Sequence, residues 1–178
     1  MSMWAPFEQI TDPGVFEQLM QVNYLGAVYC IHAALPHLLR SRGLIVAVSS
    51  AQAWTGMPMH TGYAAAKAGL QGFLDSLEME MDGRVRVLGV YPGWIRDTDL
   101  RQHALGADGR ELGEARRSHN SESVTSEECA ALVVRAVEQG KHSIFIPRKL
   151  RFLHLFRPLA FPVIRRILTR AVHSQPGK

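Results

Sequence analysis

The sequence predicts an α/β fold built on a parallel sheet, and three observations lead to this class. Segments whose apolar residues recur at helical spacing alternate with short apolar runs rich in branched residues. Such alternation is typical of parallel strands joined by helices. With 47% hydrophobic and 20% charged residues, the 178-residue chain also carries enough apolar material for one compact core.

The first expected helix begins at Asp12, which can cap it, and Pro13 suits its first turn. Apolar residues then recur at helical spacing until Pro36, which should bend or end the helix, and Gly43 follows as a stop. Residues 44–48 are apolar on both faces, as expected of a buried parallel strand.

The remaining elements repeat this alternation. A second helix is expected over about residues 61–82, followed by a strand over 84–91. Residues 97–122 are polar and irregular, which indicates a mobile lid or loop. A capping box opens a third helix over about 125–139, and residues 143–146 form a third strand.

Three strands are fewer than the roughly five or six that are typical of a sheet. The strand at 44–48 would also expose a fully apolar edge, which favours aggregation. We therefore expect further strands on its N-terminal side. The chain divides into a partial domain over residues 1–147 and a basic, apolar tail over residues 148–178.

The positive charge is concentrated towards the C-terminus. Residues 139–178 contain nine Lys or Arg and no Asp or Glu, whereas the remainder holds eleven basic and sixteen acidic residues. Three interpretations of the tail stay open: a solvated end, a helix packed near a substrate entrance, or an interfacial helix at a membrane surface. The last one depends on arginines interleaved with aliphatic residues, namely Arg165, Arg166, Arg170, Ile164, Ile167 and Leu168.

The sequence lacks the features of several other classes of protein. It has no basic–aromatic platform for nucleic acid, no signal peptide and no apolar run of about 18 residues. Cys30 and Cys129 have no metal-ligand spacing, and His60 and His103 are expected at the surface or in the lid. We expect a cytoplasmic protein that binds neither metal nor nucleic acid, with peripheral membrane contact through the tail as an alternative.

Candidate catalytic residues lie near the strand ends, where open parallel sheets form their ligand sites. Tyr63 and Lys67 are four residues apart and share one helix face. A nearby ammonium group should lower the pKa of the tyrosine, which is about 10 in the free side chain. Ser50 follows the first strand and can bond a substrate oxygen, while Asn23 can open its helix locally or hold a water.

Each of these residues also has an ordinary structural interpretation. A tyrosine and a lysine at this spacing are usually an exposed helix pair, because short motifs match by chance. Serines after a strand usually form a turn or a cap, and Ser50 does not lie in the GxSxG motif of hydrolases. Asn23 alone would usually be a satisfied polar residue within a helix.

The order of the motifs favours the catalytic interpretation. They are VNYLG at 22–26, IVAVSS at 45–50, YAAAK at 63–67 and YPGWI at 91–95. In these motifs the sequence resembles the short-chain dehydrogenase/reductase family over residues 7–100, and more weakly over 122–147. The resemblance implies the C-terminal part of a Rossmann-like, doubly wound parallel sheet. The family's TGxxxGxG turn and NNAG motif have no counterpart, so we expect an N-terminal truncation relative to the family.

The resemblance implies a role for each catalytic candidate. Tyr63 would be the acid/base that exchanges a proton with the substrate oxygen. Lys67 would lower the pKa of that tyrosine and bind the nicotinamide ribose. Ser50 would orient the substrate oxygen, and Asn23 would hold a water that links Lys67 to solvent.

The resemblance also implies residues that contact the cofactor. Pro92, Gly93 and Ile95 would line the nicotinamide, with Thr98 at the carboxamide. The family usually places that threonine at position 97, where this chain has Asp97, so the carboxamide contact departs from the family pattern. An ionised carboxylate cannot donate a hydrogen bond there.

Two functional hypotheses follow. The first is an NAD- or NADP-dependent oxidoreductase acting on a carbonyl or secondary alcohol, with a lipophilic substrate suggested by the apolar tail. The segment that distinguishes the two cofactors is absent from the sequence. The alternative is a catalytically inactive fragment that acts as an interaction module through helices at about 13–41 and 61–82. In the family these helices form the dimer interface, so we expect a homo-oligomer at full length.

Overall fold

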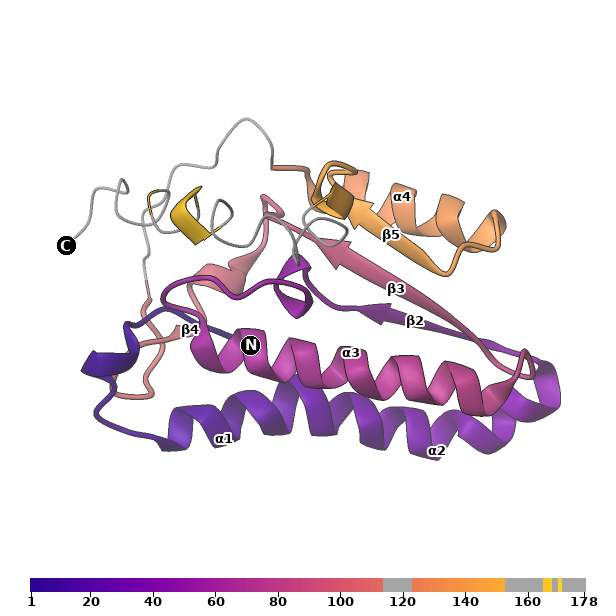
Figure 1. The fold of residues 1–178 in the computed structure, drawn as a ribbon, viewed down its shortest axis with the longest axis horizontal. Helices are drawn as coiled ribbons and strands as arrows, with labels where there is room; N and C mark the ends of the chain where they lie inside the picture. Colours follow the sequence, from indigo (N-terminus) through magenta and orange to yellow (C-terminus); the bar gives the residue numbers. More distant parts are fainter. Residues whose placement is uncertain (114–122, 153–164, 168–169, 171–178) are drawn as a thin grey trace.

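The computed structural model describes residues 1–113, 123–152, 165–167 and 170. Its main sheet contains β2 (Leu44–Val48), β3 (Arg86–Pro92) and β5 (Ser143–Ile146). All three strands are parallel, in the order β2-β3-β5 (Figure 1). The predicted parallel α/β class is therefore confirmed, and each expected strand is present within two residues of its predicted bounds.

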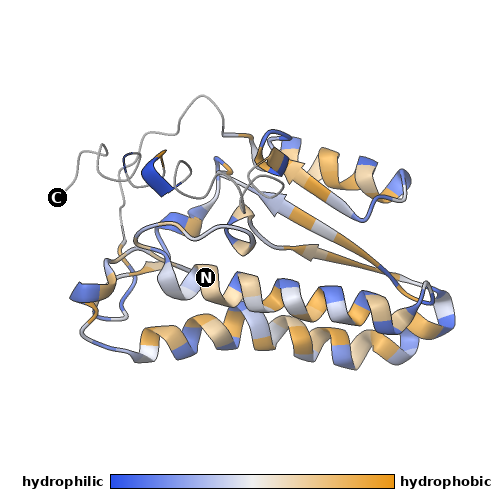
Figure 2. Cartoon of the chain, in the orientation of Figure 1, coloured by the Kyte–Doolittle hydropathy of each residue, from blue (hydrophilic) through white to orange (hydrophobic). Residues whose placement is uncertain are grey.

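Helices lie on both faces of this sheet, which confirms the doubly wound arrangement. They are α1 (Gly14–Met20), α2 (Gly26–Ser41), α3 (Thr61–Met81) and α4 (Ser126–Glu138). In Figure 1, α2 and α3 run side by side along one face and α4 covers the other. Successive β3 residues point to opposite faces, so Val87 packs towards α3 and Leu88 towards α4. Hydrophobic residues accordingly lie along β3 and β5, while the connecting turns are polar (Figure 2).

The helix that contains Pro36 continues beyond this residue. Pro36 lies inside α2, which continues to Ser41. The helix ends where Arg42 adopts a left-handed conformation with φ 49°, and the Gly43 amide donates to the carbonyl of Leu38 at 2.9 Å. Of the two effects expected of Pro36, an end of the helix is excluded, because a proline removes one hydrogen bond and neighbouring turns can carry the helix past it. The expected stop at Gly43 is confirmed.

The expected apolar edge is present on β2. Ile45 is buried, but Val46 and Val48 are 39% and 58% exposed. The strand is thus buried on one face only, which corrects the prediction of a strand buried on both. The other face stays open at Val46 and Val48 because α4, on that side of the sheet, packs mainly on β3 and β5.

Part of the expected loop at 97–122 is regular. After a 3₁₀ turn at Asp99–Arg101, strand β4 (Ala104–Leu105) pairs in parallel with β1 (Ser2–Met3). The amide of Thr11 donates to the carbonyl of Ala107 at 2.9 Å. Residues 99–113 are therefore ordered by backbone pairing with the start of the chain, whereas residues 114–122 lie outside the described part.

The elements that precede the tail, α4 and β5, agree with those predicted from the sequence. The side chain of Thr125 caps α4 in a reciprocal capping box with Glu128, as predicted. Most of the tail lies outside the described residues, and its three interpretations and the division at residue 147 stay predictions. Where the chain is described, no helix has the length and apolar character needed to cross a membrane.

Candidate active site

A cavity of about 360 Å³ lies at the carboxyl ends of β2 and β3, beside the first turns of α3. Its lining includes all the residues predicted for catalysis or cofactor binding: Asn23, Ser50, Tyr63, Lys67, Pro92, Gly93, Ile95 and Thr98. These residues come from separate segments of the chain, so the fold, rather than sequence proximity, assembles the site.

Tyr63 and Lys67 lie one turn apart on α3, and only 7% and 9% of their surfaces are exposed. Gly62 allows this end of α3 to approach α1, because a Cβ at that position would lie 2.7 Å from Phe16 Cδ1. Lys67 Nζ is 5.8 Å from the centroid of the Tyr63 ring. The pair therefore meets inside the cavity and is not the exposed helix pair that spacing alone would allow.

The predicted direction of the tyrosine pKa is wrong in this structure. Burial raises the pKa of Tyr63, and the neighbouring Ser50 hydroxyl opposes that rise. Burial also lowers the pKa of Lys67. Loss of solvation disfavours the charged form of both groups. At neutral pH Tyr63 therefore keeps its proton, as an acid that protonates a carbonyl oxygen requires.

Ser50 has both a structural position and access to the cavity. The amide of Ser49 donates to the carbonyl of Val90 at 2.8 Å, which extends the β2–β3 pairing to the cavity rim. Ser50 Oγ accepts from the amide of Gln52 at 3.1 Å and caps the short turn that follows. A hydroxyl that accepts one bond still has its own proton to donate, so this cap leaves Ser50 able to bond a substrate oxygen.

Asn23 lies in a π-helical segment, Gln21–Leu25, between α1 and α2. Its buried Nδ2 donates to the carbonyl of Leu19 at 3.2 Å and to that of Met1 at 3.1 Å. The predicted local opening of the helix at Asn23 is confirmed, whereas the water assigned to Asn23 stays a prediction. Single π turns within α-helices often mark functional positions.

The segment after β3 forms the opposite wall of the cavity. The amide of Gly93 donates to the carbonyl of Ile146 at 2.7 Å, and a Cβ on Gly93 would lie 3.0 Å from Leu150 Cδ1. Asp97 has φ 60°, in the left-handed region that a β-branched threonine disfavours. Asp97 lies outside the cavity lining, whereas Thr98 is part of it. The left-handed backbone at position 97 thus suits Asp97 better than a threonine, and Thr98 is the residue that reaches the cavity.

Several residues of the cavity lining were not predicted as site residues from sequence, among them His60, Trp94 and Arg101. His60 is 3% exposed, which corrects its expected place at the surface, and its ring centroid lies 6.0 Å from that of Tyr63. Its position one turn before Tyr63 was the available signal. His103 is exposed, as expected, and its Nδ1 lies 2.8 Å from Glu111 Oε2.

The lining fits a polar, phosphorylated nicotinamide as the bound group. Among the described residues, no Asp or Glu lines the cavity, whereas the cations of Lys67 and Arg101 do. The described lining also includes the polar side chains of Ser50, Gln52 and Thr98, which can form hydrogen bonds with polar groups of a ligand. The described residues contain no group of three side chains that could hold a metal ion.

Comparison with models of protein families agrees with this geometry. The model described as short chain dehydrogenase matches residues 1–107, which contain all four motifs and the predicted site residues. The chain belongs to the short-chain dehydrogenase family. The resemblance inferred from the motifs is therefore confirmed, and it extends into the paired segment that follows Thr98.

Curated relatives of this family member include plant proteins of similar sequence. It is 31% identical over 155 residues to an 11-beta-hydroxysteroid dehydrogenase of Pinus massoniana, covering 85% of this chain and 44% of that one. It is 33% identical over 150 residues to 11-beta-hydroxysteroid dehydrogenase-like 4A of Arabidopsis thaliana, covering 83% and 47%. The chain thus spans less than half the length of these relatives.

Solved structures share the fold. A short chain dehydrogenase from Burkholderia cenocepacia in complex with NADP matches with a TM-score of 0.74 and 22% identity, covering 94% of this chain and 65% of that one. An alcohol dehydrogenase from Thermococcus sibiricus complexed with 5-hydroxy-NADP matches with a TM-score of 0.64 and 19% identity, covering 82% and 58%. At these identities the likeness shows a partial Rossmann-like fold.

We expect folding stability to fall in alkaline solution because of Tyr91, a buried residue of β3 that directly precedes the cavity residue Pro92. Its hydroxyl donates to Gln71 Oε1 at 2.7 Å. Burial raises the pKa of Tyr91 to about 12; the bond to Gln71 opposes this, and the carboxylates of Asp75 and Glu78 add to it. The folded pKa exceeds the unfolded value of about 10, so the stabilisation is complete below that pH and is lost towards pH 12.

Urea unfolding from about pH 8 to about pH 11 measures this dependence. Tyr91→Phe should flatten the alkaline loss of stability, whereas Tyr29→Phe, at a position that is 62% exposed, should leave it unchanged. An equal alkaline slope in the wild type and in Tyr91→Phe would contradict the assignment.

Proposed function

We propose that these residues form the catalytic half of an NAD(P)-dependent oxidoreductase, with Tyr63 as the acid/base. The observation that carries this proposal is the convergence of Tyr63, Lys67, Ser50 and Asn23 on one cavity at the strand ends. The reaction is a hydride transfer to a carbonyl carbon, or from a secondary alcohol in the reverse direction. The nicotinamide supplies the hydride when it is bound.

Each of the four side chains has a defined role in this proposal. The Tyr63 hydroxyl gives its proton to the substrate oxygen in the direction of reduction, and burial keeps that proton in place until then. The Ser50 hydroxyl donates to the same oxygen and orients it. Lys67 holds the ribose hydroxyls and restores the proton of Tyr63, and Asn23 positions a water that leads from Lys67 to solvent.

The remaining walls would hold the nicotinamide ring. Pro92 and Ile95 offer apolar contacts, the absence of a side chain on Gly93 permits close approach, and Thr98 offers a hydroxyl to the carboxamide. The relatives named 11-beta-hydroxysteroid dehydrogenase support a lipophilic carbonyl or alcohol as substrate. Both NADP and NAD fit the proposal, since neighbours of the same fold are described in complex with NADP and with NADH.

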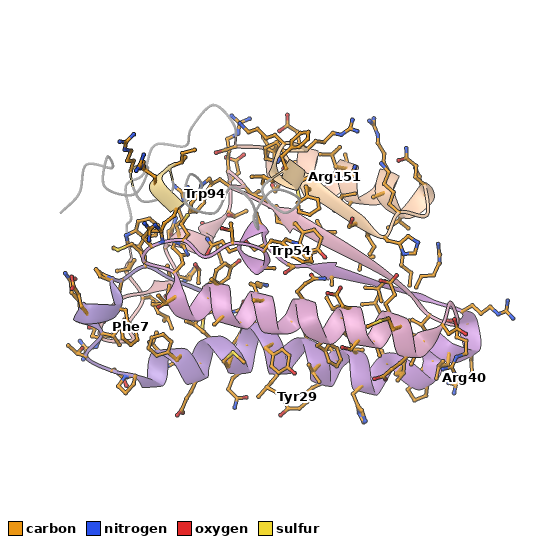
Figure 3. The ribbon with its side chains drawn as sticks, viewed as in Figure 1. Phe7, Tyr29, Arg40, Trp54, Trp94 and Arg151 are labelled. Atoms are coloured by element: carbon orange, nitrogen blue, oxygen red, sulfur yellow. The ribbon has the colours of Figure 1, made fainter. Side chains whose placement is uncertain are left out.

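A second candidate function is an interaction module without catalysis. Exposed apolar residues on α3 and on the helix that precedes it favour this candidate: Met79 is 74% exposed, Tyr29 62% and Val22 51%. Figure 3 shows Tyr29 on the outer side of the helix pair, away from the sheet. Such a surface would drive association into a homo-oligomer, which the first proposal also accommodates.

A binding titration distinguishes the two candidates. Reduced nicotinamide mononucleotide carries only the half of the cofactor that the cavity would contact, so we expect it to bind the chain saturably in calorimetry. Lys67→Met should weaken this binding by about tenfold, because a charged hydrogen bond to the ribose is lost. Lys141→Met, at an exposed position after α4, is the control. Absence of saturable binding by the mononucleotide, NADH and NADPH would favour the interaction module.

A further inference from the structure

Arg101 lines the cavity but has no role in the proposed reaction. It ends the 3₁₀ turn that follows Thr98, and its guanidinium carbon lies 4.4 Å from the centroid of the Trp94 ring. Both side chains line the cavity that contains Tyr63. Figure 3 shows Trp94 on the side of α3 that faces the sheet, opposite to the exposed Tyr29.

The donors of Arg101 are unused within the described part of the chain. There, the guanidinium forms no ion pair and no hydrogen bond, and its contact is with the indole face. Neighbouring arginines differ: Arg96 lies 4.0 Å from Glu128, and Arg110 lies 3.9 Å from Asp108. Arg101 is thus a cation held over a cavity to which the described residues contribute no carboxylate.

Stacking on an aromatic ring fixes a guanidinium while leaving its in-plane N–H groups free. Those groups match the two oxygens of a carboxylate or phosphate, which can accept two parallel bonds. Burial lowers the pKa of Arg101, which shows that its solvation is reduced, and a paired anion would compensate for that loss. In the described part of the chain, the other polar groups that line the cavity are neutral or cationic and do not supply this anion.

We propose that Arg101 binds an anionic group of the substrate, which makes the substrate an apolar carbonyl compound or alcohol with a carboxylate at one end. The inference rests on the proposed oxidoreductase function and specifies its substrate class. Apolar side chains of the same cavity, among them Met57, Leu100 and Leu150, would contact the body of such a molecule. The phosphates of the cofactor are the other source of an anion with the same chemistry.

The test compares two ketones with the same aromatic body, 4-acetylbenzoate and its methyl ester, in which a methyl group replaces the negative charge. Their dissociation constants are measured by calorimetry at neutral pH, in the presence and absence of NADPH. We expect the wild type to bind the acid about tenfold more tightly than the ester, because a charge-assisted bidentate pair is formed. Arg101→Gln should remove that preference, and Arg101→Lys should retain part of it.

The matched control is Arg110→Gln, whose side chain is 88% exposed in the same segment and which should keep the full preference. Circular dichroism melting confirms that each variant is folded; if Arg101→Gln is not, Arg101→Lys decides by whether it weakens the acid more than the ester. Equal binding of acid and ester to the wild type would overturn the inference. So would an effect of Arg101→Gln on NADPH affinity alone, which would assign the anion to the cofactor.

Failure of this inference is distinguishable from failure of the proposed function. Reduction of the ester by wild-type protein without any preference for the acid would overturn only the role of Arg101. Retained preference for the acid without hydride transfer to either ketone would overturn the oxidoreductase proposal, while leaving Arg101 as an anion-binding residue.

Discussion

Replacing Tyr63 with phenylalanine is expected to lower kcat by about 10²- to 10⁴-fold, the usual contribution of a general acid. The phenolic oxygen is the only atom lost, and the buried ring still fills its place between α1 and α3. Binding of the reduced cofactor should stay within a factor of about two, because the proton is needed for the chemical step. Steady-state rates with a ketone and NADPH or NADH, together with calorimetric titration, measure both quantities.

The matched control for this variant is Tyr24→Phe. Tyr24 packs edge-on against Phe73 with ring centroids 6.3 Å apart, and it does not line the cavity. Its loss of a hydroxyl should leave kcat unchanged. If Tyr63→Phe retained the wild-type kcat, the acid/base role of Tyr63 would have to be abandoned.

The largest expected loss of stability follows from replacing Leu19 with alanine. Leu19 is fully buried and packs in one cluster with Met3, Val15, Tyr63 and Leu105. Removing its side chain leaves a cavity, and such substitutions cost about 2–5 kcal/mol of the free energy of unfolding. This is a large share of the roughly 5–15 kcal/mol that stabilises a typical domain. Urea unfolding followed by circular dichroism measures the change.

Leu132 on α4 provides the control, since 42% of its surface is exposed. Leu132→Ala should change the free energy of unfolding by no more than about 0.5 kcal/mol. A loss below about 1 kcal/mol for Leu19→Ala would show that the cluster beneath Tyr63 is not a packed core.

Local patterns in the sequence were sufficient for the main elements of the fold. Helical spacing and capping residues predicted α3 and α4, and short branched runs predicted the three strands of the main sheet. The β1–β4 pair could not be predicted in this way, because two-residue strands carry no periodicity. That pairing depends on a contact between segments about a hundred residues apart, which only the folded chain reveals.

The residues of the site could be predicted where they belong to ordered motifs. Properties that depend on burial in the folded chain could not be predicted. The spacing of Tyr63 and Lys67 placed both on one helix face, and Asn23 indicated the local opening of its helix. The pKa of Tyr63 is raised rather than lowered because desolvation, which cannot be read from the sequence, has the largest effect. Arg101 and His60 enter the cavity through tertiary packing, so no motif identified them.

The most direct test is the transfer of label to a ketone from a nicotinamide cofactor in which both C4 hydrogens are deuterium, so that either hydride is labelled. NADPH and NADH carrying the label are each incubated with the protein and a ketone, and mass spectrometry follows deuterium in the alcohol. The account predicts one deuterium per alcohol in the wild type and a strongly reduced rate in Tyr63→Phe. Absence of label transfer from both cofactors, or an equal rate in Tyr63→Phe, would contradict the assignment of this cavity as an oxidoreductase active site.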